Sequence, residues 1–407
     1  MKEKMISPFI PKKIIDVKTS KFKIYTFNAG YKKFKDDLLV IVFEKPIKFA
    51  AVFTKSSTPS APVIWDKKLN KKNLCKVLIV NSGNANAYTG SSGIASIKEY
   101  ASFASKIFHC KLNQVFVSST GVIGEQLKPE LIIRKLETLK NKRSKRLIHA
   151  AKAIMTTDTY PKIVDETIKI NGNKIRIYGI AKGSGMIAPN MGTMLSYIFI
   201  EASLTGDLLN LLLKKNIEDS FNSISVDGDM STSDTVAIFA IENIKFGKIG
   251  KKNQYLKSIS KLLRKVMIKL AQQIACDGEG ISKLIEVNVT NAKNKNQAKK
   301  IAFSIGESLL VKTAIFGEDA NWGRIIMAIG KTSENIDPRK FSLSFGKHII
   351  LKNGMVSKQF DEKLLNNYMK NKIIRINLDL KLGLYDKTIW SSDLTKNYIE
   401  INADYRS

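Results

Sequence analysis

The chain carries many short runs of β-branched, aromatic and other apolar residues, separated by glycine, proline and asparagine. Such runs predict strands. They cover residues 37–43, 49–53, 76–80, 115–117, 174–180, 194–200, 235–241, 284–290 and 373–380. The dipeptide Lys45-Pro46 between the first two runs predicts a hairpin-like connection, and a last alternation at 398–401 predicts one more strand near the end.

Helical spacing is clearest at 256–274, where leucine, isoleucine, valine and methionine fall on one face and lysine and arginine on the other. The glycines at Gly278 and Gly280 end this helix. Further helices are predicted at 92–106, from Pro129 to about 139, at 206–217 and at 298–305. The mixture of strands and helices, with no internal repeat or long polar linker, predicts an α/β protein.

Composition narrows the classes of protein to consider. The chain has 407 residues, of which 44% are hydrophobic and 25% charged, as in a soluble globular protein. No apolar run approaches the ~18–20 residues that a membrane helix needs, and no apolar signal segment follows the start. We therefore expect a cytoplasmic protein without membrane association.

Cysteine and histidine are scarce. The three cysteines form no C-x-x-C pair, so we expect reduced thiols and neither zinc nor a disulfide framework. Because the chain has only three histidines, we expect neither a multi-histidine metal site nor a Ser-His-Asp triad.

The formal charge is +31, from 67 basic and 36 acidic residues. Such an excess attracts nucleic acid and acidic metabolites without specificity. The lysines are spread along the chain and do not interleave with aromatic residues as in a base-stacking surface. We interpret the surplus as solvated surface and expect no specific nucleic-acid partner.

The loop between the strands at 174–180 and 194–200 contains Gly192-Thr193. A threonine that follows a glycine at the start of a buried strand is placed for self-cleavage, because its hydroxyl can attack the preceding carbonyl. Cleavage would give Thr193 a free α-amine of pKa about 7.7–8.0, which can act as a base beside its own hydroxyl. The alternative is a plain glycine-rich connection between two strands.

Four other polar runs have both a structural and a functional interpretation. Residues 118–124 could form an oxyanion hole, and 156–162 could either cap a helix or border a substrate. The amide-rich run 81–87 could be a turn or the floor of a site. The run 222–234 has three closely spaced aspartates but lacks the twelfth-position glutamate of an EF-hand, so we expect no metal there.

These runs resemble those of the glutamate N-acetyltransferases of arginine biosynthesis, also called ornithine acetyltransferases. In that family an Ala-Thr-Met-Leu run carries the self-cleavage point, and here Gly192 replaces the alanine. The resemblance covers nearly the whole chain, including Ser119-Thr120-Gly121-Val122-Ile123-Gly124 and Val226-Asp227-Gly228-Asp229. The high positive charge departs from the family.

The resemblance implies a fold and an assembly. The fold is a layered helix-sheet-sheet-helix sandwich of the self-processing ornithine acetyltransferase type, with a smaller C-terminal α/β region. Cleavage would divide the chain into an alpha fragment, residues 1–192, and a beta fragment, residues 193–407. These would remain together, as an alpha2-beta2 heterotetramer.

The resemblance also implies the site residues. Thr193 is the nucleophile, cleavage lies between Gly192 and Thr193, and Thr120 and Gly121 stabilise the oxyanion. The implied substrate-binding residues are Thr156, Lys182, Thr193, Glu279, Asn402 and Ser407. Ser407 keeps the hydroxyl of the threonine found in many relatives.

The implied reaction moves an acetyl group from N2-acetylornithine to glutamate through an acetyl-Thr193 intermediate. We expect no cofactor and no metal, and the residues do not show whether acetyl-CoA also serves as an acetyl donor. Two alternatives stay open: a self-processing amidohydrolase or aminopeptidase, in which water replaces glutamate, and a basic binding protein whose site has decayed.

Overall fold

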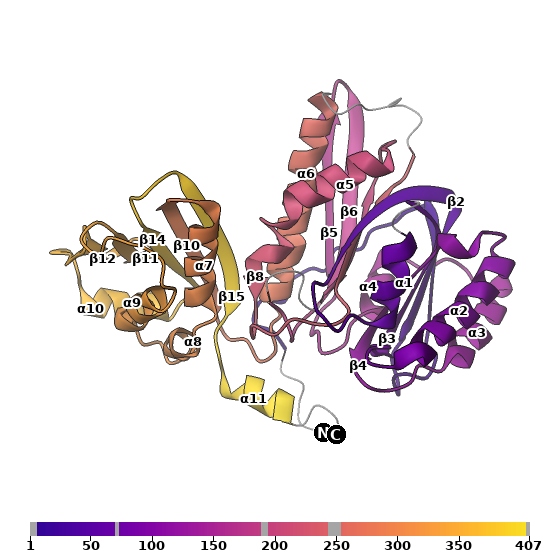
Figure 1. The fold of residues 1–407 in the computed structure, drawn as a ribbon, viewed down its shortest axis with the longest axis horizontal. Helices are drawn as coiled ribbons and strands as arrows, with labels where there is room; N and C mark the ends of the chain where they lie inside the picture. The colour runs from indigo at the N-terminus through magenta and orange to yellow at the C-terminus, as the bar shows by residue number, and fades with distance from the viewer. Residues whose placement is uncertain (1–5, 70–72, 189–193, 243–253, 404–407) are drawn as a thin grey trace.

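The computed structural model describes residues 6–69, 73–188, 194–242 and 254–403. Two β-sheets, each with its own helices, form the described part of the chain (Figure 1). No helix within those ranges is both long enough and apolar enough to span a membrane.

The first sheet has eight strands in the order β4-β3-β2-β9-β7-β6-β5, with β1 paired to β2. Most neighbours are antiparallel, but β3 with β4 and β7 with β9 are parallel. The strands are β1 (Phe22–Phe27), β2 (Leu38–Phe53), β3 (Leu74–Asn84), β4 (Val115–Val122), β5 (Lys162–Ile170), β6 (Asn173–Lys182), β7 (Leu195–Ile200) and β9 (Thr235–Ala240).

Strand β2 joins two layers of this sheet. Its first half pairs with β1 and β3, and its second half, from Lys48 onward, pairs with β9. The hairpin expected at Lys45-Pro46 is therefore wrong, because β2 is one strand of 16 residues. Its pairing with β3 shifts between Val42 and Ile47, and this irregularity accommodates Pro46, which has no N–H to give to a ladder.

The two layers pack face to face through aromatic rings. Phe239 lies at the centre, with ring centroids 5.5 Å from Phe43, 5.6 Å from Phe199 and 6.2 Å from Phe116. The four rings come from four different strands, so this cluster holds β2, β4, β7 and β9 together. Aromatic pairs at these separations add about 0.5–1.5 kcal/mol each beyond the area that they bury.

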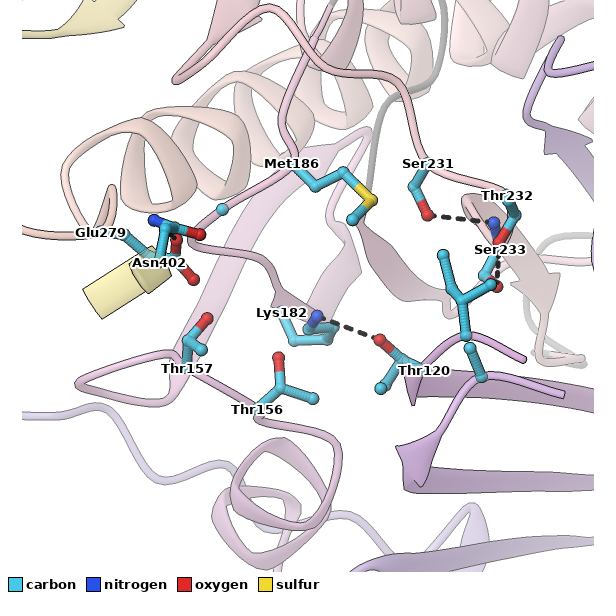
Figure 2. Close-up of a pocket in the computed structure, with 14 residues that line it drawn as sticks. Thr120, Thr156, Thr157, Lys182, Met186, Ser231, Thr232, Ser233, Glu279 and Asn402 are labelled. Atoms are coloured by element: carbon cyan, nitrogen blue, oxygen red, sulfur yellow. Dashed lines mark hydrogen bonds between the residues drawn. The ribbon is translucent and has the colours of Figure 1, made fainter. Parts of the chain in front are cut away.

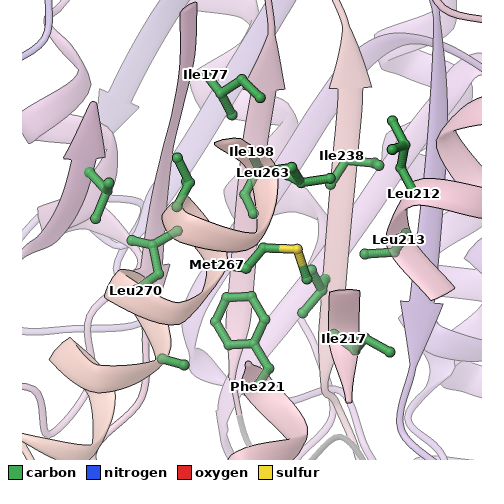
Figure 3. Close-up of a cluster of buried hydrophobic side chains, with 14 of the residues drawn as sticks. Ile177, Ile198, Leu212, Leu213, Ile217, Phe221, Ile238, Leu263, Met267 and Leu270 are labelled. Atoms are coloured by element: carbon green, nitrogen blue, oxygen red, sulfur yellow. The ribbon is translucent and has the colours of Figure 1, made fainter. Parts of the chain in front are cut away.

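Helices cover the outer face of each layer. The other side of β2, β3 and β4 packs against α1 (Ala61–Leu69), α2 (Gly90–Ile107) and α3 (Pro129–Glu137). The other side of β6, β7 and β9 packs against α5 (Gly206–Ile217) and α6 (Gln254–Ala275) (Figure 3). Helix α4 (Leu147–Ala153) packs into the core between the layers. The helix-sheet-sheet-helix sandwich is confirmed. Its two sheet layers are parts of the one eight-stranded sheet and are joined through β2.

Helix α6 confirms the amphipathic pattern in the sequence. Leu263, Met267 and Leu270 are fully buried against β6 and β7, next to Phe221 (Figure 3). Its outward face carries lysines, two of which pair with Glu166 on β5. The helix ends at Ala275, shortly before Gly278 and Gly280, which were predicted to end it.

The second sheet forms the smaller C-terminal α/β region, which is also confirmed. Its strand order is β13-β12-β11-β14-β10-β15-β8. The strands are β8 (Ile224–Ser225), β10 (Leu284–Ala292), β11 (Ser342–Phe345), β12 (His348–Lys352), β13 (Met355–Val356), β14 (Ile373–Asp379) and β15 (Tyr385–Ser392). The helices are α7 (Lys295–Gly306), α8 (Leu309–Phe316), α9 (Trp322–Gly330) and α10 (Glu362–Met369).

The last described element is the helix α11 (Lys396–Ala403), so the strand expected at 398–401 is wrong. Four residues of alternation are too few to separate a period of 2 from one of 3.6. The helical turn places Tyr398 and Asn402 four residues apart on one side of α11, and the Asn402 side chain donates to the Tyr398 carbonyl at 3.0 Å.

Candidate functional site

A pocket opens where β4 and β6 end, and it is lined by residues from seven separate segments of the chain. Six of the site residues implied by the sequence line it (Figure 2). They are Thr120, Gly121, Thr156, Lys182, Glu279 and Asn402. The other three, Gly192, Thr193 and Ser407, lie outside the described residues.

Lys182 and Thr120 form the centre of the pocket. Lys182, the last residue of β6, is only 2% exposed, and its ammonium group donates to Thr120 Oγ1 at 3.2 Å. An ammonium group can only donate, so the Thr120 oxygen is the acceptor and the hydroxyl hydrogen is left to donate elsewhere. Burial lowers the pKa of Lys182, while the carboxylate of Asp158 opposes this shift.

Gly121 allows β4 to approach β3 very closely. Its φ is +132°, and a Cβ there would lie 2.3 Å from the carbonyl carbon of Gly83. No other residue type fits this position without moving the backbone. The close approach therefore requires glycine at the residue that follows Thr120.

Glu279 and Asn402 lie together on one side of the pocket, with Ser231, Thr232 and Ser233 on the opposite side (Figure 2). The Asn402 amide donates to Glu279 Oε2 at 2.9 Å, and the Glu279 backbone N–H donates to the Ser184 carbonyl at 3.1 Å. The Glu279 side chain is 7% exposed, and within the described ranges no lysine or arginine pairs with it. Its carboxylate is suited to receive a ligand ammonium group.

A buried ionic triad lies behind these side chains. The Lys162 ammonium group donates to Asp158 and to Asp277, each at 2.6 Å, and all three side chains are 0% exposed. Asp158 also accepts the backbone N–H groups of Thr156 at 2.9 Å and Gly183 at 2.7 Å. Because Asp277 lies two residues before Glu279, the triad ties together three segments that line the pocket.

Lys162 and Asp158 stabilise each other's charge, whereas burial raises the pKa of Asp277 although Lys162 opposes this shift. Burial alone would raise the pKa of Asp158, but Lys162, Lys182 and the Gly183 N–H outweigh it and hold that pKa well below its usual range. Burial likewise opposes the charge of Lys162, and the carboxylates of Asp158 and Asp277 raise its pKa above the ordinary value. Asp158 is thus an anion and Lys162 a cation at neutral pH.

The helix-capping interpretation of the run at 156–162 is wrong. Asp158 follows α4 and precedes β5, so its two backbone hydrogen bonds organise the pocket wall and cap no helix. The hydrogen bonds and the ion pair within the wall occupy the Asp158 carboxylate. The side chains of Thr156 and Thr157 line the pocket.

The chain resumes beside this pocket after the undescribed residues 189–193. In the β6–β7 pairing Lys182 stands opposite Leu195, and the Met194 N–H donates to Asp234 Oδ1 at 2.7 Å. Residues 231–233, just before Asp234, line the pocket. The first described residue after Thr193 therefore lies at the same end of the sheet as Lys182.

Several pocket residues were not identified from the sequence. Thr157, Met186 and the hydroxyl run Ser231-Thr232-Ser233 belong to the lining. Only Asp234 separates this run from β9, and three consecutive hydroxyls shortly before a buried strand were the available signal. The run lies within an acidic stretch whose closely spaced aspartates suggest a metal loop more strongly than a substrate pocket.

That acidic stretch anchors a loop. Asp227 accepts the backbone N–H groups of Met186 and Ile187, the latter at 2.8 Å. Across the described ranges, no group of three or more histidine, cysteine, aspartate or glutamate side chains is arranged to hold a metal ion.

The amide-rich run 81–87 covers the end of β3 and the turn after it, and it is structural, although it borders the pocket through Ala85. Asn81, Asn84 and Asn86 are almost fully buried, and their side-chain amides donate to backbone carbonyls. They hold the turn beside Gly121 in place. The sequence left open whether this run is a turn or the floor of a site, and it did not show that the amides are already paired.

Comparison with known proteins gives the family. A model described as the ArgJ family matches residues 23–407. The chain belongs to the ArgJ family. Arginine biosynthesis bifunctional protein ArgJ of Bartonella henselae is 44% identical over 406 residues, covering 99% of both chains. The ArgJ protein of Bradyrhizobium diazoefficiens is also 44% identical, over 411 residues and 99% of both chains.

A solved structure is also similar. The crystal structure of the ArgJ protein from Bacillus halodurans is 34% identical and covers 52% of this chain and 100% of its own, with a TM-score of 0.47. Membership of the ArgJ family confirms the resemblance from which the site residues were carried over, since the family match spans every implied site residue.

Proposed function

We propose that this ArgJ family chain transfers an acetyl group from N2-acetylornithine to glutamate, after cleaving itself between Gly192 and Thr193. The observation that carries the proposal is the convergence of six implied site residues, from distant parts of the chain, on one pocket. The buried lysine beside a hydroxyl and the glutamate–asparagine pair support a site for a substrate that carries both a carboxylate and an ammonium group.

The proposed reaction has two steps. Thr193 Oγ attacks the acetyl carbonyl, its proton passes to the α-amine of the same residue, and ornithine leaves with that proton on its amine. The amine of glutamate then attacks the acetyl-threonine ester, and N-acetylglutamate leaves as the hydroxyl of Thr193 is restored. An amine next to the nucleophile contributes a rate factor of about 10²–10⁴ as a general base.

The pocket supplies the complementary charges. The hydroxyl hydrogen of Thr120 is free to donate to the oxyanion, because its oxygen already accepts from Lys182. Lys182 has further N–H groups for the carboxylate that both substrates share. Glu279, supported by Asn402, receives the side-chain ammonium group of ornithine.

The test compares ornithine release with and without glutamate. A transferase releases ornithine continuously only when glutamate is present, whereas glutamate-independent turnover would indicate an amidohydrolase. Thr193→Ala should remain one chain on a denaturing gel and release no ornithine. Two fragments from that variant would show that the proposed cleavage point is wrong.

A further inference from the structure

A second cavity, of about 380 Å³, lies on the other side of the wall that holds Thr156 and Asp158. Thr156 lines both this cavity and the candidate active-site pocket. The remaining lining comes from the loop before β2, from α4 and from the segment before β5: Lys32, Lys35, Asp36, His149, Lys152, Met155, Thr159 and Pro161. Of the residues that line this cavity, only Thr156 and Asp158 belong to the site described above.

The lining carries cations without matching anions. Lys35 and Lys152 are exposed and make no ion pair among the described residues. The two carboxylates in the lining are already paired elsewhere, Asp36 with Lys145 at 3.0 Å and Asp158 with Lys162 at 2.6 Å. The lysines therefore leave a net positive field inside a concave surface.

Lys32 lies deepest among these lysines. Its ammonium group donates to Ser82 Oγ and, at 2.6 Å, to the Met155 carbonyl, neither of which neutralises its charge. Burial lowers the pKa of Lys32 to about 8, with Asp37 opposing and Lys182 assisting the shift. An anion in the cavity would restore part of the stabilisation that this charge loses by leaving water.

We propose that this cavity binds a phosphate group, either as free phosphate or as part of a larger metabolite. The single negative charge of a carboxylate would balance only part of the positive charge of the three lysines. A phosphate carries nearly two negative charges at neutral pH and three acceptor oxygens, and lysine binds it as a point charge. The volume accepts an inorganic ion together with water or the phosphate end of a larger molecule.

The experiment measures binding of inorganic phosphate by calorimetry at constant ionic strength, with chloride as the replaced anion. The cavity variant is the double substitution Lys35→Gln and Lys152→Gln. The control variant, Lys98→Gln and Lys106→Gln, removes the same charge from exposed positions on α2, away from the cavity. Thermal unfolding without phosphate checks that both variants fold.

The wild-type chain and the control should bind phosphate equally, and the cavity variant should bind about tenfold more weakly or worse, since each lost charge contact near the surface is worth several-fold in affinity. A competition arm with coenzyme A identifies the source of the phosphate. If coenzyme A displaces phosphate at a concentration below that of the phosphate, the natural ligand is a phosphate-bearing metabolite. If coenzyme A does not displace it, the ligand is free phosphate.

Three results would overturn the proposal. They are no phosphate binding by the wild-type chain, equal binding by the cavity variant, or an equal loss in the control variant. The last two would mean an adventitious ion only, attracted by the general positive charge of the surface.

Discussion

The ammonium group of Lys182 is enclosed at the centre of the candidate pocket, next to the hydroxyl of Thr120. Burial makes the charged form less favourable, so the pKa of Lys182 lies below that of an ordinary lysine. If this ammonium group binds the substrate carboxylate, then affinity must fall when it loses its proton.

The KM for N2-acetylornithine should therefore rise as the pH increases from neutral to alkaline, and it should do so before an ordinary lysine would titrate. Below the lowered pKa the ammonium group is charged and the carboxylate is bound; above it, this attraction is lost. Lys182→Gln should have a high KM that changes little over the same pH range. A KM profile that is identical in the two proteins would remove Lys182 from substrate binding.

Gly185 provides a second test at the scale of one residue. A Cβ at this position would lie 2.3 Å from Glu279 Oε2, so Gly185→Ala must displace the carboxylate. We expect the KM for N2-acetylornithine to rise about tenfold or more, because a displaced charge partner costs more than about 1.4 kcal/mol.

The matched control is Gly330→Ala, since a Cβ at Gly330 meets nothing within 4 Å. That variant should keep the wild-type KM. A normal KM in Gly185→Ala would show that the position of the Glu279 carboxylate does not matter for binding.

At the scale of elements, the triad of Asp158, Lys162 and Asp277 joins β5 to the segments that follow α4 and α6. Replacing Lys162 by methionine would leave two buried carboxylates without their cation. Removing one partner of a buried ion pair costs about 3–5 kcal/mol. We therefore expect Lys162→Met to lose about this much free energy of unfolding in urea.

Lys265→Met is the control, because Lys265 is an exposed partner of Glu166 on the surface of α6. Such a pair contributes about 0–1 kcal/mol. Equal destabilisation by the two substitutions would contradict a special role for the buried triad.

Elements with strong local patterns were predictable from the sequence, and those that depend on distant partners were not. Helix α6 carries its apolar face over 22 residues, so its pattern was unambiguous. In β2 the sequence shows a proline that normally interrupts a strand, but not the irregular pairing that tolerates it. The four-residue alternation in α11 contained too little information to distinguish helix from strand.

The candidate site was predictable for a different reason. The positions of Thr120, Gly121 and Glu279 came from resemblance to a family, and the structure brings them to one pocket. The triad was not predicted, because Lys162 and Asp277 are 115 residues apart and nothing local in the sequence pairs them. Contacts of this kind follow from the fold and not from any single motif.

At the scale of the whole molecule, the proposed cleavage lies between two neighbouring strands of one sheet. In the antiparallel pair of β6 and β7, Ile177 stands opposite Ile200 at one end and Lys182 opposite Leu195 at the other. Residues on both sides of the proposed cut therefore share backbone hydrogen bonds. Strand β9 of the second fragment also pairs with β2 of the first. The fragments 1–192 and 193–407 therefore share a core.

We expect the two fragments to elute together in size-exclusion chromatography under native conditions and to separate only in denaturant. The reason is that separation would expose both the broken sheet and the aromatic cluster between its layers. Fragments that separate in native buffer would contradict this shared core.

The decisive measurement for the acetyl-threonine mechanism is the intact mass of the protein after incubation with N2-acetylornithine in the absence of glutamate. We predict a fragment that starts at Thr193 and carries one additional acetyl group, which disappears when glutamate is added. A single uncut chain, or a fragment starting at Thr193 that never acquires the acetyl group, would contradict the proposed acetyl-threonine mechanism.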